Sequence, residues 1–121
     1  MHEIIFYRDK NGKEPVLEYI TKLTNSSSKD SRIKANRILA YIDYLRKMGK
    51  QIREPYAKHL EGEIWELRPI RDRILFAAWD GKSFILLHYF VKQTQKTPQR
   101  EIDKAKRELA DMRTRSISNE Q

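Results

Sequence analysis

The sequence predicts an α+β domain in the order β-α-α-β-β-β-α, with helices packed on one face of a mostly antiparallel four-stranded sheet. Two helical patterns follow a short opening strand, and a third helical pattern lies near the end of the chain. Between them, Ile64 to Phe90 hold three strand-like segments, and Asp80-Gly81 forms a hairpin signal between two apolar runs. Sequential antiparallel strands with segregated helices favour this class over a parallel α/β fold.

The first part of the chain combines one strand with a helical hairpin. Glu3 to Arg8 is rich in β-branched and aromatic residues, and the turn formers Asp9 to Gly12 end it. Pro15 suits the first position of a helix. The apolar stripe of that helix consists of Val16, Leu17, Ile20 and Leu23. The polar residues Asn25 to Ser28 are too few for an interdomain linker, so we expect them to join two helices.

The second helix has the most regular amphipathic pattern in the chain. Asp30 or Ser31 can cap its start, and Gly49 can end it. Its apolar positions recur at intervals of three and four residues, at Ala35, Ile38, Leu39, Ile42, Leu45 and Met48. The next segment, Gln51 to Glu63, shows no clear period and contains a proline and a glycine, which indicates an ordered loop.

Three antiparallel strands follow as a meander. We expect them at Ile64 to Arg68, Arg73 to Trp79 and Ser83 to Phe90. Pro69 ends the first because it lacks the N–H that a ladder needs, and Asp80-Gly81 fits a two-residue type I′ turn. The opening strand should pair in parallel with an inner strand of the meander, because its two-helix crossover is long enough. One face of the sheet would then remain open for function.

The last helix follows the meander after a short basic segment. Thr97 fits its N-cap and Pro98 its first position. Its apolar positions are Ile102, Ala105, Leu109 and Met112. We expect one domain over residues 1–115 and a polar tail from Ser116 to Gln121, in which the helix frays. The length of 121 residues suits one domain with a core and is too short for two.

Composition narrows the class of protein and of partner. The absence of cysteine excludes disulfides, thiolate metal sites and cysteine nucleophiles. No apolar run approaches about 18 residues. The opening residues form a strand rather than a signal peptide, so we expect a cytoplasmic protein with no membrane partner. The formal charge of +8 favours a polyanion, nucleic acid before acidic protein, although many surface lysines alone would give the same charge.

Six polar side chains are candidates for a phosphodiester site, and strand alternation places several of them on one sheet face. They are Glu66, Arg68, Arg73, His88, Lys92 and Lys96. Metal-free RNA cleavage proceeds by attack of the 2′-hydroxyl on phosphorus. It needs a base, cations for the phosphorane charge and an acid for the 5′-oxygen. The two arginine forks can each bind two phosphate oxygens, so this set can bind and cleave a phosphodiester.

Four of these residues have a second interpretation. Glu66 can act as the base or can orient the two arginines. Lys92 and Lys96 can hold phosphate, transfer a proton, or be ordinary exposed lysines. His88 can be an acid or base, or a packed core residue. The three histidines show no ligand spacing and the chain has no glycine-rich phosphate loop, so we expect neither a metal nor a nucleotide cofactor.

A family signature surrounds these candidates. The chain contains Glu66-Leu67-Arg68, Arg73-Ile74-Leu75-Phe76, Leu87-His88-Tyr89-Phe90-Val91-Lys92 and Gln95-Lys96-Thr97-Pro98, followed by Glu101-Ile102 and Ala105. These motifs resemble the RelE/HigB toxin superfamily, and more closely its phage-derived HigB-like branch. The resemblance implies a RelE-like fold. It also implies the toxin of a type II toxin–antitoxin system, an endoribonuclease that cleaves mRNA, usually on the translating ribosome, and inhibits translation.

The resemblance also implies a protein partner. A cognate antitoxin, commonly with a helix-turn-helix domain, neutralises such toxins and represses the shared operon, so operator DNA is reached only through the antitoxin. We expect the antitoxin to cover the sheet or the basic helices, because a charge of +8 attracts an acidic or amphipathic partner. Two alternatives stay open. One is a non-catalytic RNA- or ribosome-binding module with Trp79 and Phe90 stacked on bases, and the other is a degenerate toxin that serves as corepressor.

Overall fold

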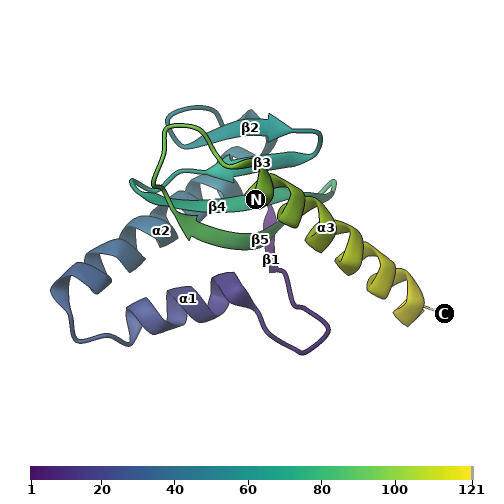
Figure 1. Cartoon of the computed structure of the whole chain (residues 1–121), viewed down its shortest axis with the longest axis horizontal. Coiled ribbons are helices and arrows are strands. Elements are labelled where there is room, and N and C mark those ends of the chain that lie inside the picture. The colour runs from purple at the N-terminus through teal and green to yellow at the C-terminus, as the bar shows by residue number, and fades with distance from the viewer. Residues whose placement is uncertain (121) are drawn as a thin grey trace.

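A five-stranded sheet in the order β1-β5-β4-β3-β2 forms the middle of the protein, with helices on both sides of it (Figure 1). The computed structural model describes residues 1–120, with side chains up to residue 117. The α+β class is confirmed, with one strand more than expected. The elements are β1 (Glu3–Phe6), α1 (Pro15–Thr24), α2 (Lys29–Met48), the 3-10 helix η1 (Gly49–Gln51), β2 (Ala57–Glu61), β3 (Ile64–Leu67), β4 (Asp72–Asp80), β5 (Ser83–Val91) and α3 (Gln99–Glu120).

The additional strand, β2, lies in the segment from Gln51 to Glu63 that we expected to be a loop. It pairs antiparallel with β3, with Ala57 opposite Leu67, and the connection contains Gly62. Gly62 has a φ of 55°, which glycine adopts without strain. β2 is the edge strand of the sheet, and Ala57 is its one buried residue. An edge strand of this kind needs no apolar alternation, so the segment carries no strand signal.

β1 runs parallel to β5, with Glu3 opposite Ser83 and Phe6 opposite Leu86. The parallel pairing is confirmed, but β5 is the last strand of the meander and not the inner one. The inner strand, β4, already has β3 on one edge and β5 on the other, so it has no free backbone groups for a third partner. β5 continues past the end of β1 to Val91, and within residues 1–120 no strand pairs with this second half on the β1 edge, whereas β4 pairs with it on the other edge.

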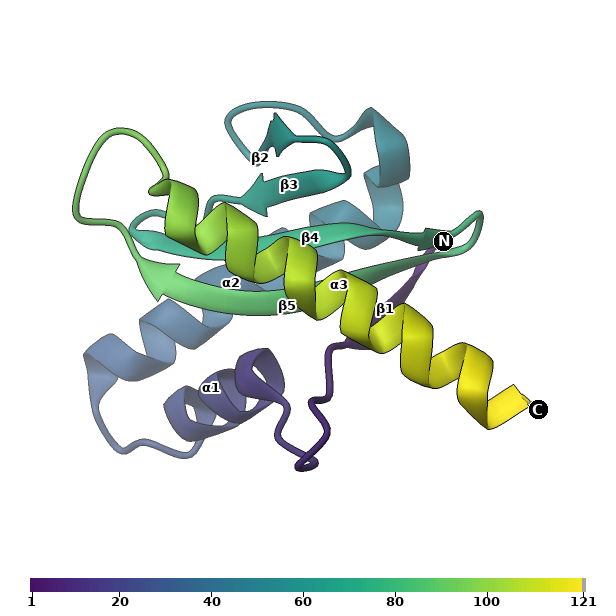
Figure 2. The same cartoon turned by 45° about the vertical axis from the view of Figure 1, so that its right-hand side comes forward.

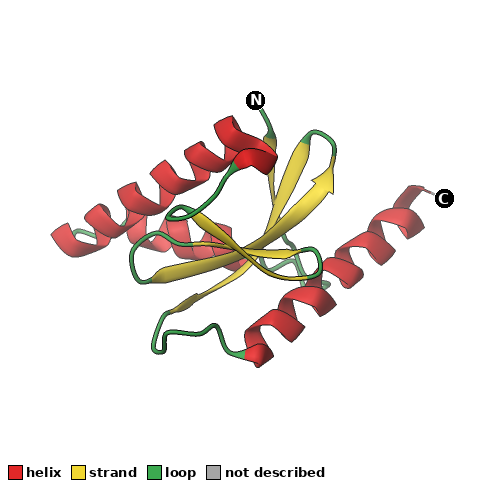
Figure 3. Cartoon of the chain, turned by 90° about the horizontal axis from the view of Figure 1, so that it is seen from above, coloured by secondary structure: helices red, strands yellow, loops and turns green. Residues whose placement is uncertain are grey.

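The helices cover both faces of the sheet, whereas we predicted helices on one face. α1 and α2 pack against one face and α3 crosses the other (Figure 2, Figure 3). Along β4, the buried Ile74 and Phe76 belong to the core under α1 and α2. Their neighbours Leu75 and Ala77 belong to the core under α3. Continuous apolar runs of this kind are typical of strands buried on both faces, and they were the sequence signal for two helical layers.

The β4–β5 hairpin is confirmed, but its turn differs from the predicted one. The register pairs Asp80 with Ser83, so Gly81 and Lys82 are the two turn residues. Within residues 1–120, positive φ occurs at Ile70 and at glycines other than Gly81, so the turn is not type I′. The Asp80 carboxylate organises it by accepting a hydrogen bond from the Lys82 N–H at 2.8 Å.

Capping residues determine the ends of α2. Ser28 is its N-cap, in place of the expected Asp30 or Ser31. The Ser28 hydroxyl accepts a hydrogen bond from the Ser31 N–H at 3.4 Å. Gly49 ends the helix with a φ of 57°, as predicted.

α3 is the longest helix of the fold, at 22 residues. It continues through Glu120, so the stretch from residue 116 that we expected to be a frayed tail is helical as far as it is described, and residue 121 lies outside the described residues. Its charged residues recur along its whole length. No helix of residues 1–120 has an apolar stretch long enough to cross a bilayer.

Candidate functional site

The sheet places three of the predicted site residues on the face that α3 covers. Glu66 lies opposite Leu75 on the neighbouring strand, and Leu75 lies opposite His88 on the next. Arg73 lies two residues before Leu75 and opposite Phe90. Residues directly opposite or two apart share a face, so the predicted clustering on one face is found in the structure. The face is not open, because α3 crosses it.

Glu66 joins the two arginines. Its carboxylate is 2% exposed, and its Oε1 lies 3.5 Å from Arg68 Nε and 3.7 Å from Arg73 Nε. The other oxygen, Oε2, accepts a hydrogen bond from the Thr97 hydroxyl. Arg68, which follows β3, also lies 3.7 Å from Glu54. A buried carboxylate is stable only with such partners, and here they hold two guanidinium groups beside each other.

Arg73 is itself nearly buried, with 5% of the residue exposed. Its Nη1 donates to the carbonyl oxygens of Ile70 at 2.7 Å and of Asp72 at 2.9 Å. Burial lowers the pKa of the Arg73 guanidinium below its ordinary value, and the charge of Glu66 acts in the opposite direction. Ile70 holds a left-handed φ of 57°, a strained conformation for a β-branched residue. The tight corner before β4 therefore fixes the direction of Arg73.

A cavity of about 330 Å³ opens at this end of the sheet. Arg73 and Phe90 contribute to its lining, and the loop from β5 to α3 forms one wall with Lys92 and Lys96. The Lys92 N–H donates to the Arg71 carbonyl oxygen at 2.7 Å, which anchors the start of the loop. Lys92 is half-buried and Lys96 is exposed, and neither forms an ion pair with another described residue. Arg100 also lines the cavity, and four cations that converge on one concave surface suit the charge of a phosphate group.

Arg68 is not in the lining of this cavity, although it was predicted with the other three cations. It lies on the far side of Glu66, which contacts Arg68 and Arg73 with the same oxygen. Arg68 remains partly exposed, with 24% of its side chain accessible. The positive charge of the site therefore extends from the cavity past Glu66 to Arg68.

His88 lies under α3 and not in the cavity. Its ring is buried, with Nδ1 2.5 Å from Glu108 and Nε2 3.0 Å from Glu101. Both ring nitrogens are therefore engaged by glutamate side chains of α3. Because these carboxylates lie on opposite sides of the ring, they do not converge on one point as metal ligands would.

Sequence reasoning missed three residues of this region. Thr97 was expected to cap α3, but its hydroxyl donates to Glu66. Glu101 and Glu108 were not recognised as partners of His88. Their spacing of seven residues places them on one side of a helix, and that face of α3 was the available signal.

One comparison with known proteins identifies a family. The family model described as phage derived protein Gp49-like matches residues 26–110, which is more than half of the chain. No curated protein sequence matches the chain. The matched range covers α2, the meander with Glu66, Arg68 and Arg73, and the loop with Lys92 and Lys96. The chain therefore belongs to the phage-derived Gp49-like protein family.

Proposed function

We propose that this chain is a toxin of the RelE/HigB type that cleaves mRNA while the mRNA is bound to the translating ribosome. The observation that supports the proposal is the shared cavity of Arg73, Lys92 and Lys96, with Arg68 linked to it through Glu66. Membership in a phage-derived, toxin-like family agrees with it. The substrate class follows from the charge of the cavity, since its four lining cations match a phosphodiester under attack.

The reaction is an in-line attack of the RNA 2′-hydroxyl on the adjacent phosphorus. The O2′–P bond forms and the P–O5′ bond breaks, which leaves a 2′,3′-cyclic phosphate and a 5′-hydroxyl. Arg73 and Lys92 hold the non-bridging oxygens, on which negative charge grows in the transition state. Lys96 is an exposed cation of the cavity and protonates the departing 5′-oxygen, while the proton of the 2′-hydroxyl goes to solvent.

Glu66 acts in this proposal through the arginines. Its oxygens contact Arg68, Arg73 and Thr97, it is almost wholly buried and it does not line the cavity, so it orients the two arginines. A divalent metal is not part of the mechanism, because the cations that line the cavity would repel it. Electrostatic stabilisation by fixed donors then supplies most of the rate enhancement.

The neutralising partner belongs to the same proposal. An antitoxin with a helix-turn-helix domain would bind this chain and carry it to operator DNA, which the toxin itself does not contact. The charge of +8 supports an acidic or amphipathic binding segment. Co-expression with the adjacent reading frame tests this part, because a true antitoxin restores growth and co-purifies with the chain.

Conservative variants of the cavity test the enzyme directly. Arg73→Lys keeps the buried charge but loses the guanidinium fork, and Lys96→Gln removes an exposed cation without disturbing packing. Each should lower cleavage of a translated message about 100-fold or more, as removal of one transition-state donor does. Cleavage is read by primer extension on RNA recovered from the translation reaction, and circular dichroism checks the fold.

Lys82→Gln is the matched control, because Lys82 is an exposed lysine in the β4–β5 turn, at the opposite end of the strand. It should cleave like the wild type. Ribosome association of the cavity variants should fall much less than cleavage. A parallel loss of ribosome binding, with no cleavage product from the wild type, would instead indicate the non-catalytic module. A chain that neither cleaves nor binds ribosomes but still represses with its antitoxin would be a corepressor.

A further inference from the structure

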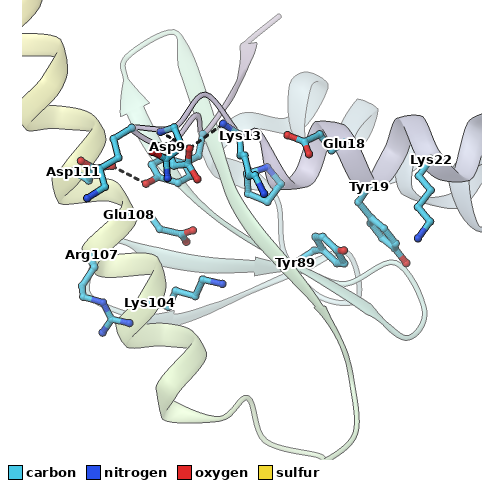
Figure 4. Close-up of a pocket in the computed structure, with 14 residues that line it drawn as sticks. Asp9, Lys13, Glu18, Tyr19, Lys22, Tyr89, Lys104, Arg107, Glu108 and Asp111 are labelled. Carbon is cyan, nitrogen blue, oxygen red and sulfur yellow. Dashed lines mark hydrogen bonds between the residues drawn. The ribbon is translucent and has the colours of Figure 1, made fainter.

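A second cleft lies outside the cavity of Arg73, Lys92 and Lys96. It has a volume of about 850 Å³ and is lined by the loop after β1, by α1, by Tyr89 of β5 and by α3 (Figure 4). We call it the α1–α3 groove. It lies along the edge of β5 that β1 leaves unpaired beyond Leu86, and α1 and α3 form its two walls.

The cations of the groove are unpaired. Lys10, Lys13 and Lys22 line one wall, and Lys104 and Arg107 line the other. All five are exposed, and none of them forms an ion pair with another described residue. Figure 4 shows Lys104 reaching from α3 into the space between the walls. Unpaired cations on facing walls focus a positive potential in the space between them.

The carboxylates of the groove are already engaged. Asp9 accepts the N–H groups of Asn11 and Lys13, each at 2.9 Å. Glu18 accepts the Glu14 N–H at 2.7 Å. The other two acidic residues are also bound, Asp111 to Tyr7 and Arg115 and Glu108 to His88. The acidic side chains therefore serve internal contacts, and the cations remain available to an external anion.

A continuous row of cations joins the groove to the cavity. Arg100 lines the cavity, and Lys104 and Arg107 line the groove. Residues spaced by four and three positions lie on one helix face, so the three side chains form a row about 10 Å long.

Tyr89 presents an aromatic ring in the wall of the groove. It stacks on Tyr19 of α1 with the ring centroids 3.9 Å apart and the planes 4° apart. Both residues are half-buried, so the pair is part of the groove wall and is held rigidly by packing. Basic grooves with aromatic side chains along the path are the usual means of holding single-stranded nucleic acid without sequence preference.

We propose that the α1–α3 groove holds the RNA strand that flanks the scissile phosphate. This inference rests on the proposed function, because it takes the cavity as the place of cleavage. The row of Arg100, Lys104 and Arg107 then tracks successive phosphates away from the cavity, and Lys10 and Lys13 contact the same strand from the opposite wall. Recognition is through the backbone, so the groove adds affinity and orientation and no base specificity.

A charge-matched pair of variants tests the groove. The groove variant carries Lys10→Gln, Lys13→Gln, Lys104→Gln and Arg107→Gln. The control variant carries the same number and type of changes at exposed cations on other surfaces, namely Arg46→Gln, Lys50→Gln, Lys58→Gln and Lys82→Gln. The two proteins have equal net charge, so any difference in their RNA binding reflects where the removed cations lie on the protein.

The probe is a fluorescent single-stranded RNA with a 2′-deoxy linkage in place of each cleavable one, titrated over a range of salt concentrations. The groove variant should lower the slope of log Kd against log salt by about 3, since each phosphate contact in a single strand contributes about 0.7. The control variant should keep the wild-type slope. On cleavable RNA the groove variant should raise KM and leave kcat within a few-fold.

Three results would overturn the inference. Equal salt-dependence slopes for the groove and control variants would mean that RNA binding depends on the net charge of the protein and not on the position of these cations. If the groove variant binds RNA as tightly as the wild type but no longer binds an acidic antitoxin peptide, the groove is a protein-binding site and not an RNA-binding site. An absence of RNA binding by the wild type would remove the ligand altogether. The proposed function is tested separately from the groove. If the wild type cleaves RNA and Lys96→Gln does not, the proposed function stands even when one of these three results rules out the groove. If the wild type binds RNA in the groove but does not cleave it, the proposed function is wrong and the groove remains an RNA-binding site.

Discussion

Glu66 shows how one buried charge organises its surroundings. The carboxylate is 2% exposed and is compensated by Arg68, Arg73 and the hydroxyl of Thr97. Removal of a single partner from such a group leaves a desolvated charge, which costs more than the hydrogen bond itself contributes. Thr97 is the one neutral member of this set, so it can be changed without altering any charge.

Thr97→Val should destabilise the protein by about 1–3 kcal/mol, because the valine side chain has the same shape and leaves Glu66 Oε2 without its donor. Thr97→Ser retains the hydroxyl and should stay within about 1 kcal/mol of the wild type. Urea unfolding of the three proteins measures the difference. Equal losses in both variants would mean that the threonine methyl group, and not the hydrogen bond, stabilises this contact.

α3 is held to the sheet by contacts of different kinds along its length. Near its start, Glu101 and Glu108 enclose His88. Further on, Arg113 donates to both oxygens of Glu63 at 2.8 Å, and Tyr7 donates to Asp111 at 2.6 Å. The apolar side of the helix packs on the sheet between these polar contacts. The second half of α3 therefore depends on two carboxylates that acid can neutralise.

Acid should weaken the second half of α3. Hydrogen bonds from Arg113 lower the pKa of Glu63, and hydrogen bonds from Arg115 and then Tyr7 lower the pKa of Asp111. A carboxyl whose pKa is depressed in the folded state contributes stability above its unfolded pKa of about 4, and that contribution disappears as the pH falls through the folded value. Each contribution is at most about 1 kcal/mol, because solvent screens both groups.

The measurement compares the wild type with Glu63→Gln/Asp111→Asn by urea unfolding between about pH 6 and about pH 3. The wild type should be the more stable protein at the upper end, and the difference should shrink as the pH falls. Hydrogen exchange should show the same trend in the amides of residues 109–117. A difference that stays constant with pH would mean that these pairs act through packing and not through charge.

The sheet is shared by two hydrophobic cores. One lies under α1 and α2, and the other lies under α3. β4 and β5 supply buried side chains to both, so neither core can form without the same two strands. The two tryptophans report on the cores separately, because Trp65 packs against the first and Trp79 against the second. We expect the two cores to unfold together.

Leu109→Ala tests this coupling. Leu109 is 4% exposed in the core under α3, so its truncation should cost about 2–5 kcal/mol. In the Trp65→Phe and Trp79→Phe backgrounds, the remaining tryptophan reports one core at a time. Both signals should shift to the same lower urea midpoint, as a single cooperative transition requires. A shift in Trp79 fluorescence alone would show that α3 and its core unfold independently.

Most elements could be predicted from residues close together in the chain. The helical periodicity of α2, the stop at Gly49, the β4–β5 hairpin and the shared face of Glu66 and Arg73 all follow from local spacing and from the alternation of a strand. β2 escaped prediction because an edge strand with one buried residue leaves little trace in the sequence.

Contacts between distant segments could not be read in this way. β1 joins β5 because β4 has no free edge, and α3 covers the second sheet face because the loop after β5 returns the helix across it. That return buries His88 between carboxylates 13 and 20 residues away, and it builds the α1–α3 groove from walls far apart in the chain. Side-chain direction is a local property of the backbone, whereas burial and partners depend on which segment packs above each side chain, and only the packed fold decides that.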